Sequence, residues 1–154
     1  MLYFNLGDGG VVKTILREGS GEKIPSEGVQ AIVHYTGRFT DGTVFDSSKK
    51  RGIPFQFSLN KRQVIFGWDA CVSTMKKNEI CVVTCKSSYA YGDRGIGPIP
   101  PKSTLVFEIE LIDWIPDDGS SSTLFSEMLT KIWFYVLIAF VVGGYYVYAK
   151  GYYL

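Results

Sequence analysis

Short segments in which apolar and polar residues alternate make up most of the chain between residues 11 and 115, and clusters of Gly, Asp and Pro separate them. In the segment 29–39, Ala31, Val33 and Tyr35 fall on one face of an extended chain. This period of two is typical of a β-sheet with one buried face. We therefore predict strands at 11–17, 29–39, 55–59, 79–87 and 104–115.

Only one segment of this region has the period of a helix. In 67–75, apolar side chains recur at i, i+3, i+4 and i+7, at Trp68, Cys71, Val72 and Met75. One short helix then has to cover one antiparallel sheet. The pattern therefore predicts an α+β fold with a single layer of helix.

Composition argues against several functions. Sixteen basic and fifteen acidic residues give a net charge of +1 without a basic stripe, so nucleic acid is not an expected partner. The single histidine, His34, and the lack of paired Cys/His spacing argue against hydrolysis, a metal site or another cofactor. Cys81 and Cys85 share a face of a predicted strand, and we interpret them as packed thiols.

Four sequence blocks carry a resemblance to a known family. They are VHYTG at 33–37, DGTVFDSS at 41–48, VIFGW at 64–68, and YAYG at 89–92 followed by IPP at 99–101 and TLVFE at 104–108. In this order and spacing they resemble the FK506-binding-protein (FKBP) type of peptidyl-prolyl cis–trans isomerase. The resemblance implies a half-barrel, in which a twisted antiparallel sheet wraps around a short helix with an aromatic pocket between them.

The resemblance also implies roles for individual residues. Trp68 would form the floor of the pocket, while Asp46, Tyr91 and the backbone N–H of Ile65 would supply polar contacts, and a basic residue, Arg51, would pair with the aspartate. The implied catalytic residues are Asp46, Tyr91, Ile65, Trp68 and Phe45. The implied substrate-binding or macrolide-binding residues are Tyr35, Arg51, Phe55, Gln63, Val64, Ile99 and Phe107.

Two departures and two simpler interpretations stay open. Gln63 stands where many family members have Glu, at a position expected to act through its backbone carbonyl. The loop 92–101 is a residue shorter than in several members, so that either Ile96 or Ile99 would roof the pocket. The aromatic residues could instead be plain core, and Asp46 could be a turn residue that bonds its own backbone.

The expected chemistry needs no covalent step. Rotation about an X-Pro bond breaks amide resonance, with a barrier of about 18–20 kcal/mol. A dry aromatic pocket favours the less polar, twisted amide over the planar one. We therefore predict an isomerase that acts on proline-containing polypeptides, and the family resemblance implies that it also binds macrolides such as tacrolimus and rapamycin. The alternatives are a non-catalytic proline-binding scaffold and a drug-dependent inhibitor of a phosphatase or kinase.

The C-terminal region has a different composition. Residues 132–149 are eighteen uncharged residues bracketed by Lys131 and Lys150. A helix of that length spans about 27 Å, close to the ~30 Å hydrocarbon core of a bilayer. We predict an isomerase domain at 1–116, a flexible linker at 117–123 and a C-terminal helix at 124–154 with a transmembrane span at about 132–149. A helix packed on the domain or lying flat on a bilayer is the alternative.

The location of the protein follows from the same region. The span lies within five residues of the last residue, which predicts insertion after synthesis as a tail anchor. The first ten residues lack the basic and apolar regions of a signal peptide. We therefore expect the isomerase domain in the cytosol, and we favour the endoplasmic reticulum over the outer mitochondrial membrane.

Overall fold

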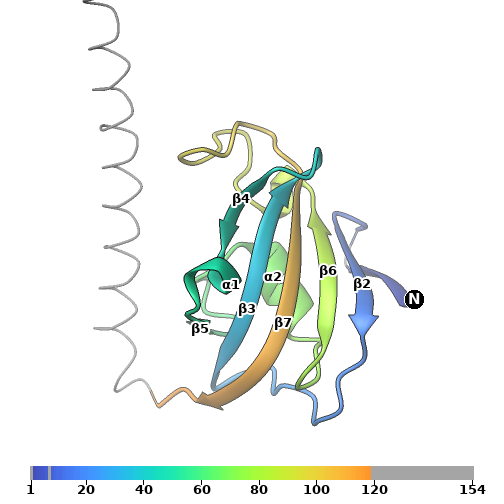
Figure 1. Ribbon diagram of the computed structural model, residues 1–154, viewed down its shortest axis with the longest axis vertical. Coiled ribbons are helices and arrows are strands. Elements are labelled where there is room, and N and C mark those ends of the chain that lie inside the picture. Colours follow the sequence, from blue (N-terminus) through green and yellow to red (C-terminus); the bar gives the residue numbers. More distant parts are fainter. Residues whose placement is uncertain (1, 7, 119–154) are drawn as a thin grey trace, which may run out of the picture. The chain divides into compact units, whose positions relative to one another are not determined.

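The computed structural model describes residues 2–6 and 8–118, which contain one antiparallel sheet in the order β1-β2-β6-β7-β3-β4, with β5 also paired to β3. Figure 1 shows α2 behind β3 and β7, on one face of this sheet. The strands are β1 Leu2–Leu6, β2 Val11–Arg17, β3 Val29–Phe39, β4 Val44–Ser47, β5 Phe55–Ser58, β6 Ile80–Cys85 and β7 Leu105–Pro116. The helices are α1 Ser48–Arg51, α2 Phe66–Val72 and the 3₁₀ turn η1 Ser87–Tyr89.

The alternation in the sequence predicts the buried face of the sheet correctly. In β7, Leu105, Phe107, Ile109 and Leu111 are buried and the residues between them are not. β7 pairs along almost its full length with β3, in the register Tyr35↔Ile109 and Gly37↔Phe107. A register shift between Ile32 and Val33 interrupts the ladder, and such an irregularity increases the local bend and twist of a sheet.

The helix α2 covers the buried face with the side chains that the periodicity indicates. Trp68, Cys71, Val72 and Met75 are all buried, with Met75 lying in a turn after the helix. The predicted range 67–75 was therefore one residue late at its start and three residues late at its end. A close approach to β6 is possible because residue 67 is Gly, where a Cβ would overlap the Cys85 side chain.

α2 is the predicted short helix over the antiparallel sheet, and the described residues also contain α1 and the turn η1, which the sequence pattern did not indicate. α1 is only four residues long, too short to show a helical period, but its two ends carry recognisable caps. The Ser47 side chain accepts a hydrogen bond from Lys50 N, and Gly52 has a φ of 70°. The strands β1 and β4 were also not predicted, because β4 has four residues and β1 lies at the sheet edge.

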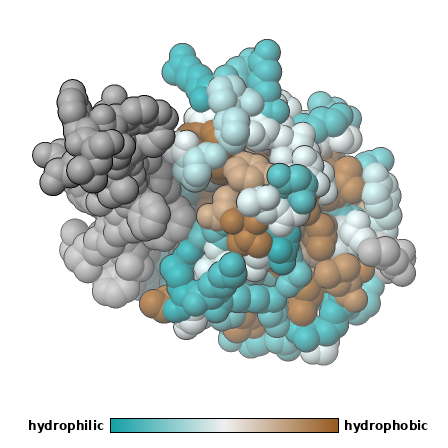
Figure 2. Space-filling view, turned by 45° about the horizontal axis from the view of Figure 1, so that its top comes forward, coloured by the Kyte–Doolittle hydropathy of each residue, from teal (hydrophilic) through white to brown (hydrophobic). Residues whose placement is uncertain are grey.

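Strand limits differ little from the predictions. β2 and β3 have the predicted limits, whereas β5 and β6 are shorter than 55–59 and 79–87, and β7 is shifted by one residue from 104–115. On the face shown in Figure 2, hydrophobic residues lie in small patches between hydrophilic ones. Scattered apolar surface of this kind is ordinary for a folded domain.

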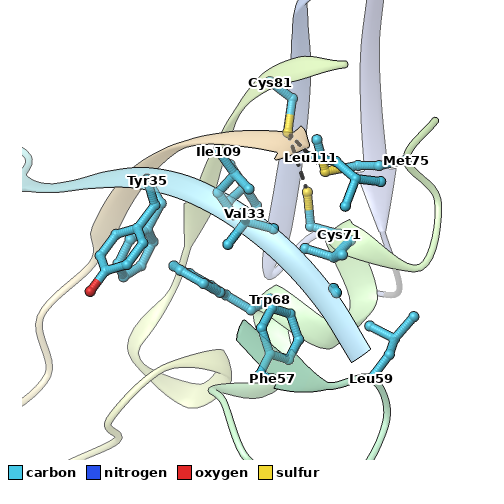
Figure 3. Close-up of a cluster of buried hydrophobic side chains, with 14 of the residues drawn as sticks. Val33, Tyr35, Phe57, Leu59, Trp68, Cys71, Met75, Cys81, Ile109 and Leu111 are labelled. Atoms are coloured by element: carbon cyan, nitrogen blue, oxygen red, sulfur yellow. Dashed lines mark hydrogen bonds between the residues drawn. The ribbon is translucent and has the colours of Figure 1, made fainter. Parts of the chain in front are cut away.

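The interpretation of Cys81 and Cys85 as packed thiols is confirmed. All three cysteines are buried and free, but the thiol closest to Cys81 Sγ belongs to Cys71, 3.6 Å away, rather than to Cys85. Figure 3 shows this contact together with the one from Cys81 to Met75. Cys85 lies further along β6, against the start of α2.

The predicted linker from residue 119 onward, the C-terminal helix 124–154 and the span at 132–149 lie outside the described residues. Within residues 2–6 and 8–118, no helix has both the length and the apolar character needed to cross a membrane.

Candidate active site

Trp68 stands at the centre of a cluster of aromatic side chains. Its ring centroid lies 4.9 Å from that of Tyr35, 5.3 Å from that of Phe107 and 6.0 Å from that of Phe55, in edge-to-face arrangements. Aromatic rings prefer this geometry because the positive edge of one meets the negative face of the other. Figure 3 shows the Trp68 ring directed toward Tyr35 and Phe57 from α2. With only 4% of its surface exposed, Trp68 can serve as a floor but not as a rim.

Phe45 joins the cluster from β4. Its ring lies 5.7 Å from that of Phe107, at an interplanar angle of 89°. Both rings pack over Gly37 in β3, where a Cβ would lie 2.6 Å from the Phe45 ring and 3.0 Å from the Phe107 ring. A side chain at position 37 would therefore displace two members of the cluster. β3, β4, β5, β7 and α2 each contribute at least one ring.

Three polar side chains meet at the edge of these rings. The Tyr35 hydroxyl donates a hydrogen bond to Asp46 Oδ2, and Arg51 Nη1 donates one to Asp46 Oδ1. Arg51 Nη2 also donates to the Tyr35 hydroxyl, at 3.1 Å. The ion pair that the resemblance implied for Arg51 and Asp46 is thus present. Asp46 belongs to β4 and lies opposite Gly37, so the alternative of a turn residue bonding its own backbone is not what the structure shows.

The short helix α1 fixes this polar group to the sheet. The Ser48 hydroxyl, fully buried at the start of α1, accepts a hydrogen bond from Tyr35 N at 2.8 Å. His34 Nδ1 lies 3.1 Å from the same hydroxyl, in agreement with its interpretation as a structural residue. Tyr35 is therefore held at its backbone by α1 and at its hydroxyl by Asp46. Arg51, three residues after Ser48, is placed by the same helix.

Burial changes the ionisation of the two tyrosines. It raises the pKa of Tyr35 well above its ordinary value of about 10, and the hydrogen bond to the Asp46 carboxylate raises it further. Burial also raises the pKa of Tyr91, with a smaller contribution from the negative charge of Asp46. Both phenols stay protonated at neutral pH, so each keeps a hydroxyl group that can donate.

The remaining predicted residues surround the cluster less tightly. Phe55, Val64 and Ile65 are partly buried and pack against the core, and Ile65 is the N-cap residue of α2 without a side-chain cap. The Gln63 side chain accepts a hydrogen bond from Ser58 N at 2.8 Å. This position therefore acts structurally through its side chain, which the expectation of a backbone role did not anticipate. Tyr91 is 38% exposed.

The loop 92–101 favours one of the two candidate roof residues. The backbone N–H of Ile96 donates a hydrogen bond to the Ile99 carbonyl at 3.0 Å, and the N–H of Ile99 donates one to the Ile96 carbonyl at 2.8 Å. Ile99 is 7% exposed and belongs to the core cluster, whereas Ile96 is 47% exposed. Ile99 is thus the residue of the pair that packs against the domain.

Sequence reasoning missed two residues that shape the site. Phe57 lies 5.9 Å from Trp68 and 5.8 Å from Phe55, and it shares a face of β5 with Phe55 because the two are two positions apart. That spacing could have revealed it. Ser48 gave no comparable signal, because its role depends on contact with a strand thirteen residues earlier in the chain.

The chain is similar in sequence to proteins of a known family. Residues 21–112 match the model of the family described as FKBP-type peptidyl-prolyl cis-trans isomerase. The chain is 52% identical over 115 residues to FK506-binding protein 59 of Drosophila melanogaster, an alignment that covers 74% of this chain and 26% of the relative. It is 51% identical over 112 residues to human peptidyl-prolyl cis-trans isomerase FKBP4, covering 72% of this chain and 24% of the relative.

The chain therefore belongs to the FKBP-type peptidyl-prolyl cis–trans isomerase family, which confirms the resemblance drawn from its four sequence blocks. It spans about a quarter of the length of the curated relatives it matches.

Proposed function

We propose that the domain accelerates rotation about X-Pro bonds in polypeptides, with the aromatic cluster over Trp68 as the site that receives the proline ring. The observation that carries this proposal is the meeting of the Asp46, Tyr35 and Arg51 side chains at the edge of that cluster. An apolar floor with a polar edge suits an amide that becomes less polar as it twists. Family membership supports the same activity.

Each part of the site has a task in this proposal. The rings of Trp68 and its neighbours exclude water and contact the pyrrolidine ring, since proline has no N–H to satisfy. The Ile65 N–H, at the start of α2, holds a substrate carbonyl during rotation, and Tyr91 donates from the rim. Asp46 orients the amide through its fixed carboxylate, which Arg51 keeps in place. No group forms a covalent bond to the substrate.

Exchange NMR on short X-Pro peptides tests the activity directly. We expect the protein to accelerate cis-to-trans exchange, with Leu or Phe preferred before the proline. Lack of acceleration by a folded protein would favour the alternative, a non-catalytic scaffold that grips proline-bearing segments of a membrane partner.

We further propose that tacrolimus and rapamycin bind in the same site and compete with peptide. The support is the same aromatic cluster, together with the name of the Drosophila relative, an FK506-binding protein. Titration of the protein with tacrolimus, followed by tryptophan fluorescence and by inhibition of exchange, tests this. Inhibition of a phosphatase or kinase by the drug complex would depend on additional surfaces and needs a separate assay.

We also propose that residues 132–149 span a membrane and hold the domain at its cytosolic face, with the endoplasmic reticulum as the favoured membrane. The support is the run of eighteen uncharged residues between Lys131 and Lys150, with Trp133 and Tyr135 near one end and Tyr145, Tyr146 and Tyr148 near the other. Carbonate extraction should leave the protein in the membrane pellet, and protease added outside the vesicles should remove the domain. Release by carbonate would contradict the proposal.

A further inference from the structure

Phe66 is a large apolar residue whose side chain lies outside the hydrophobic core. Its side chain is 64% exposed, although it directly follows Ile65, which packs against the core, and lies two residues before Trp68, which is 4% exposed. Single exposed hydrophobic residues are common on folded domains. Exposure alone therefore does not assign a binding role to Phe66, and its contacts have to be considered.

The Phe66 ring rests on a support that is fixed from two sides. Its centroid lies 5.6 Å from that of Tyr89, at an interplanar angle of 43°. The Tyr89 hydroxyl donates a hydrogen bond of 2.6 Å to Asp8 Oδ1. The Tyr89 ring also packs so closely on Gly10 that a Cβ there would overlap it. Because Tyr89 cannot move freely, the exposed Phe66 ring has a rigid backing, which lowers the entropic cost of a contact made on it.

The chain places this aromatic pair beside the proposed proline site. Consecutive Cα atoms are about 3.8 Å apart, so Phe66 lies one residue from the Ile65 N–H that the proposed function assigns to a substrate carbonyl. On the other side, Tyr89 is two residues from Tyr91, the polar residue of the rim. One segment at the rim of the site contains Ile65 and the other contains Tyr91. The contact between Phe66 and Tyr89 joins these two segments.

We infer that Phe66, backed by Tyr89, forms a substrate subsite that binds an apolar side chain of the polypeptide flanking the proline. This inference rests on the proposed function. An extended peptide advances about 3.3–3.6 Å per residue, so a residue within three positions of the proline can reach the Phe66 ring. An apolar occupant is indicated because the exposed surface is an aromatic ring, and the Asp8 carboxylate behind it already accepts hydrogen bonds from Tyr89 and Gly10 N.

The test compares peptides that differ at one flanking position. The full chain is assayed by exchange NMR with pairs of proline peptides. The two peptides of a pair carry Phe or Gly at one position, and the pairs cover the three positions before the proline and the three after it. At one position we expect kcat/KM to favour Phe, and Phe66→Ala should reduce that preference about tenfold, the low end of the range by which apolar contacts discriminate between substrates. Phe66→Tyr keeps the aromatic face and should retain the preference. Leu16→Ala, at an exposed apolar residue of β2, is the matched control.

The possible outcomes separate this inference from the function on which it rests. If Phe66→Ala leaves the ratio of kcat/KM between the Phe and Gly peptides unchanged at every position, the subsite is wrong but the proposed isomerase activity is not affected. An equal loss on both peptides, with the ratio preserved, would contradict the subsite as well, because it would show a general role for Phe66. If the wild type accelerates no peptide, the proposed function itself fails and the subsite falls with it.

Discussion

The two ends of α2 face cores of different character. Around Trp68 lie aromatic rings, and the polar residues Asp46 and Arg51 sit at their edge, with 11% and 36% of their side chains exposed. Figure 3 shows the opposite end, where Cys71 and Met75 pack with Cys81.

Beside this sulfur-rich end lies a second ion pair, which has a different environment. Lys13 Nζ lies 2.6 Å from Glu79 Oε1, and only 3% of each side chain is exposed. Lys13 also donates to Thr74 Oγ1 at 2.9 Å, and Glu79 Oε2 accepts from Lys76 N at 3.0 Å. The buried pair is therefore held by contacts within the protein, although Glu79 Oε1 has the Lys13 ammonium beside it and no hydrogen bond. The Asp46–Arg51 pair is more exposed and lies at the edge of the aromatic cluster. We expect the first pair to affect stability and the second to affect activity.

Removing one partner of the buried pair should have the largest effect. Glu79→Ala leaves the Lys13 ammonium buried without its carboxylate, and breaking such a pair costs about 3–5 kcal/mol. Urea unfolding followed by tryptophan fluorescence measures the loss. Lys77→Ala, which breaks the exposed pair with Asp113, is the matched control and should change stability far less.

The double variant Lys13→Met/Glu79→Leu sharpens this test. Because it removes both charges together and keeps apolar volume, it should recover most of the stability lost in Glu79→Ala. If Glu79→Ala is no less stable than the Lys77→Ala control, the contrast between a structural and a functional ion pair is wrong.

Asp46→Ala should have the converse effect, with a large loss of activity and a small loss of stability. The substitution removes the acceptor for Tyr35 and Arg51 at the edge of the site. Hydrogen bonds to charged groups are worth about 1.5–3 kcal/mol, so kcat/KM should fall about 10- to 100-fold. Exchange NMR measures the activity, and tacrolimus affinity should fall with it.

A matched control for Asp46→Ala is Lys49→Ala, which removes the neighbouring surface ion pair with Glu108. It should leave exchange rates unchanged. Full activity in Asp46→Ala would show that the polar group at the aromatic edge has only a structural role, like the buried Lys13–Glu79 pair.

The two ends also differ in how far the sequence predicts them. β2 and β3 have the predicted limits because alternating apolar residues mark extended segments there, although the polar residues Lys13, Gln30 and Thr36 are buried as well. At the aromatic end the resemblance implied the Asp46–Arg51 pair, which is present, but not the hydrogen bonds that join the Tyr35 hydroxyl to both residues. Pattern alone could not have done so, because β4 and α1 have four residues each and show no period.

The buried ion pair could not be predicted from local sequence. Lys13 falls on the inward face of β2, where a lysine is expected only if it is paired. Its partner Glu79 is sixty-six residues away and precedes β6. Only the pairing of β2 with β6 brings the two together, in the register Lys13↔Val83. Such a contact is a consequence of topology, which side-chain periodicity does not contain.

Tyr35→Phe should have a smaller effect than Asp46→Ala. The variant keeps the ring that packs on Trp68 but loses the hydroxyl that joins Asp46 and Arg51, whose ion pair remains. Hydrogen bonds to charged groups contribute about 1.5–3 kcal/mol, and because the Asp46 carboxylate stays in place we expect kcat/KM to fall about tenfold, at the low end of that range. A loss as large as that of Asp46→Ala would mean that Asp46 acts only through Tyr35. Exchange NMR on the two variants side by side decides this.

The smallest expected effect is a difference in alkaline stability between the wild type and Tyr35→Phe. Burial and the Asp46 carboxylate raise the pKa of Tyr35 above its ordinary value of about 10. Above pH 10 the unfolded chain therefore releases the Tyr35 proton while the folded protein keeps it, so the free energy of unfolding falls as pH rises. The slope from one such group is at most about 1.4 kcal/mol per pH unit. Below pH 9 the group contributes no slope.

Urea unfolding of the wild type and Tyr35→Phe at steps from pH 8 to 11 measures this difference. Burial also raises the pKa of the Cys85 thiol, to about 12, and that group contributes alkaline loss equally in both proteins. Subtracting the two curves therefore isolates Tyr35, and the gap between them should begin to change only above pH 10. Tyr3→Phe, at a ring that is 63% exposed, controls for loss of a phenol elsewhere and should follow the wild type. Parallel curves for all three proteins would show that the Tyr35 hydroxyl is as accessible as a surface phenol, and the aromatic end would then lack the dry floor on which the proposed mechanism depends.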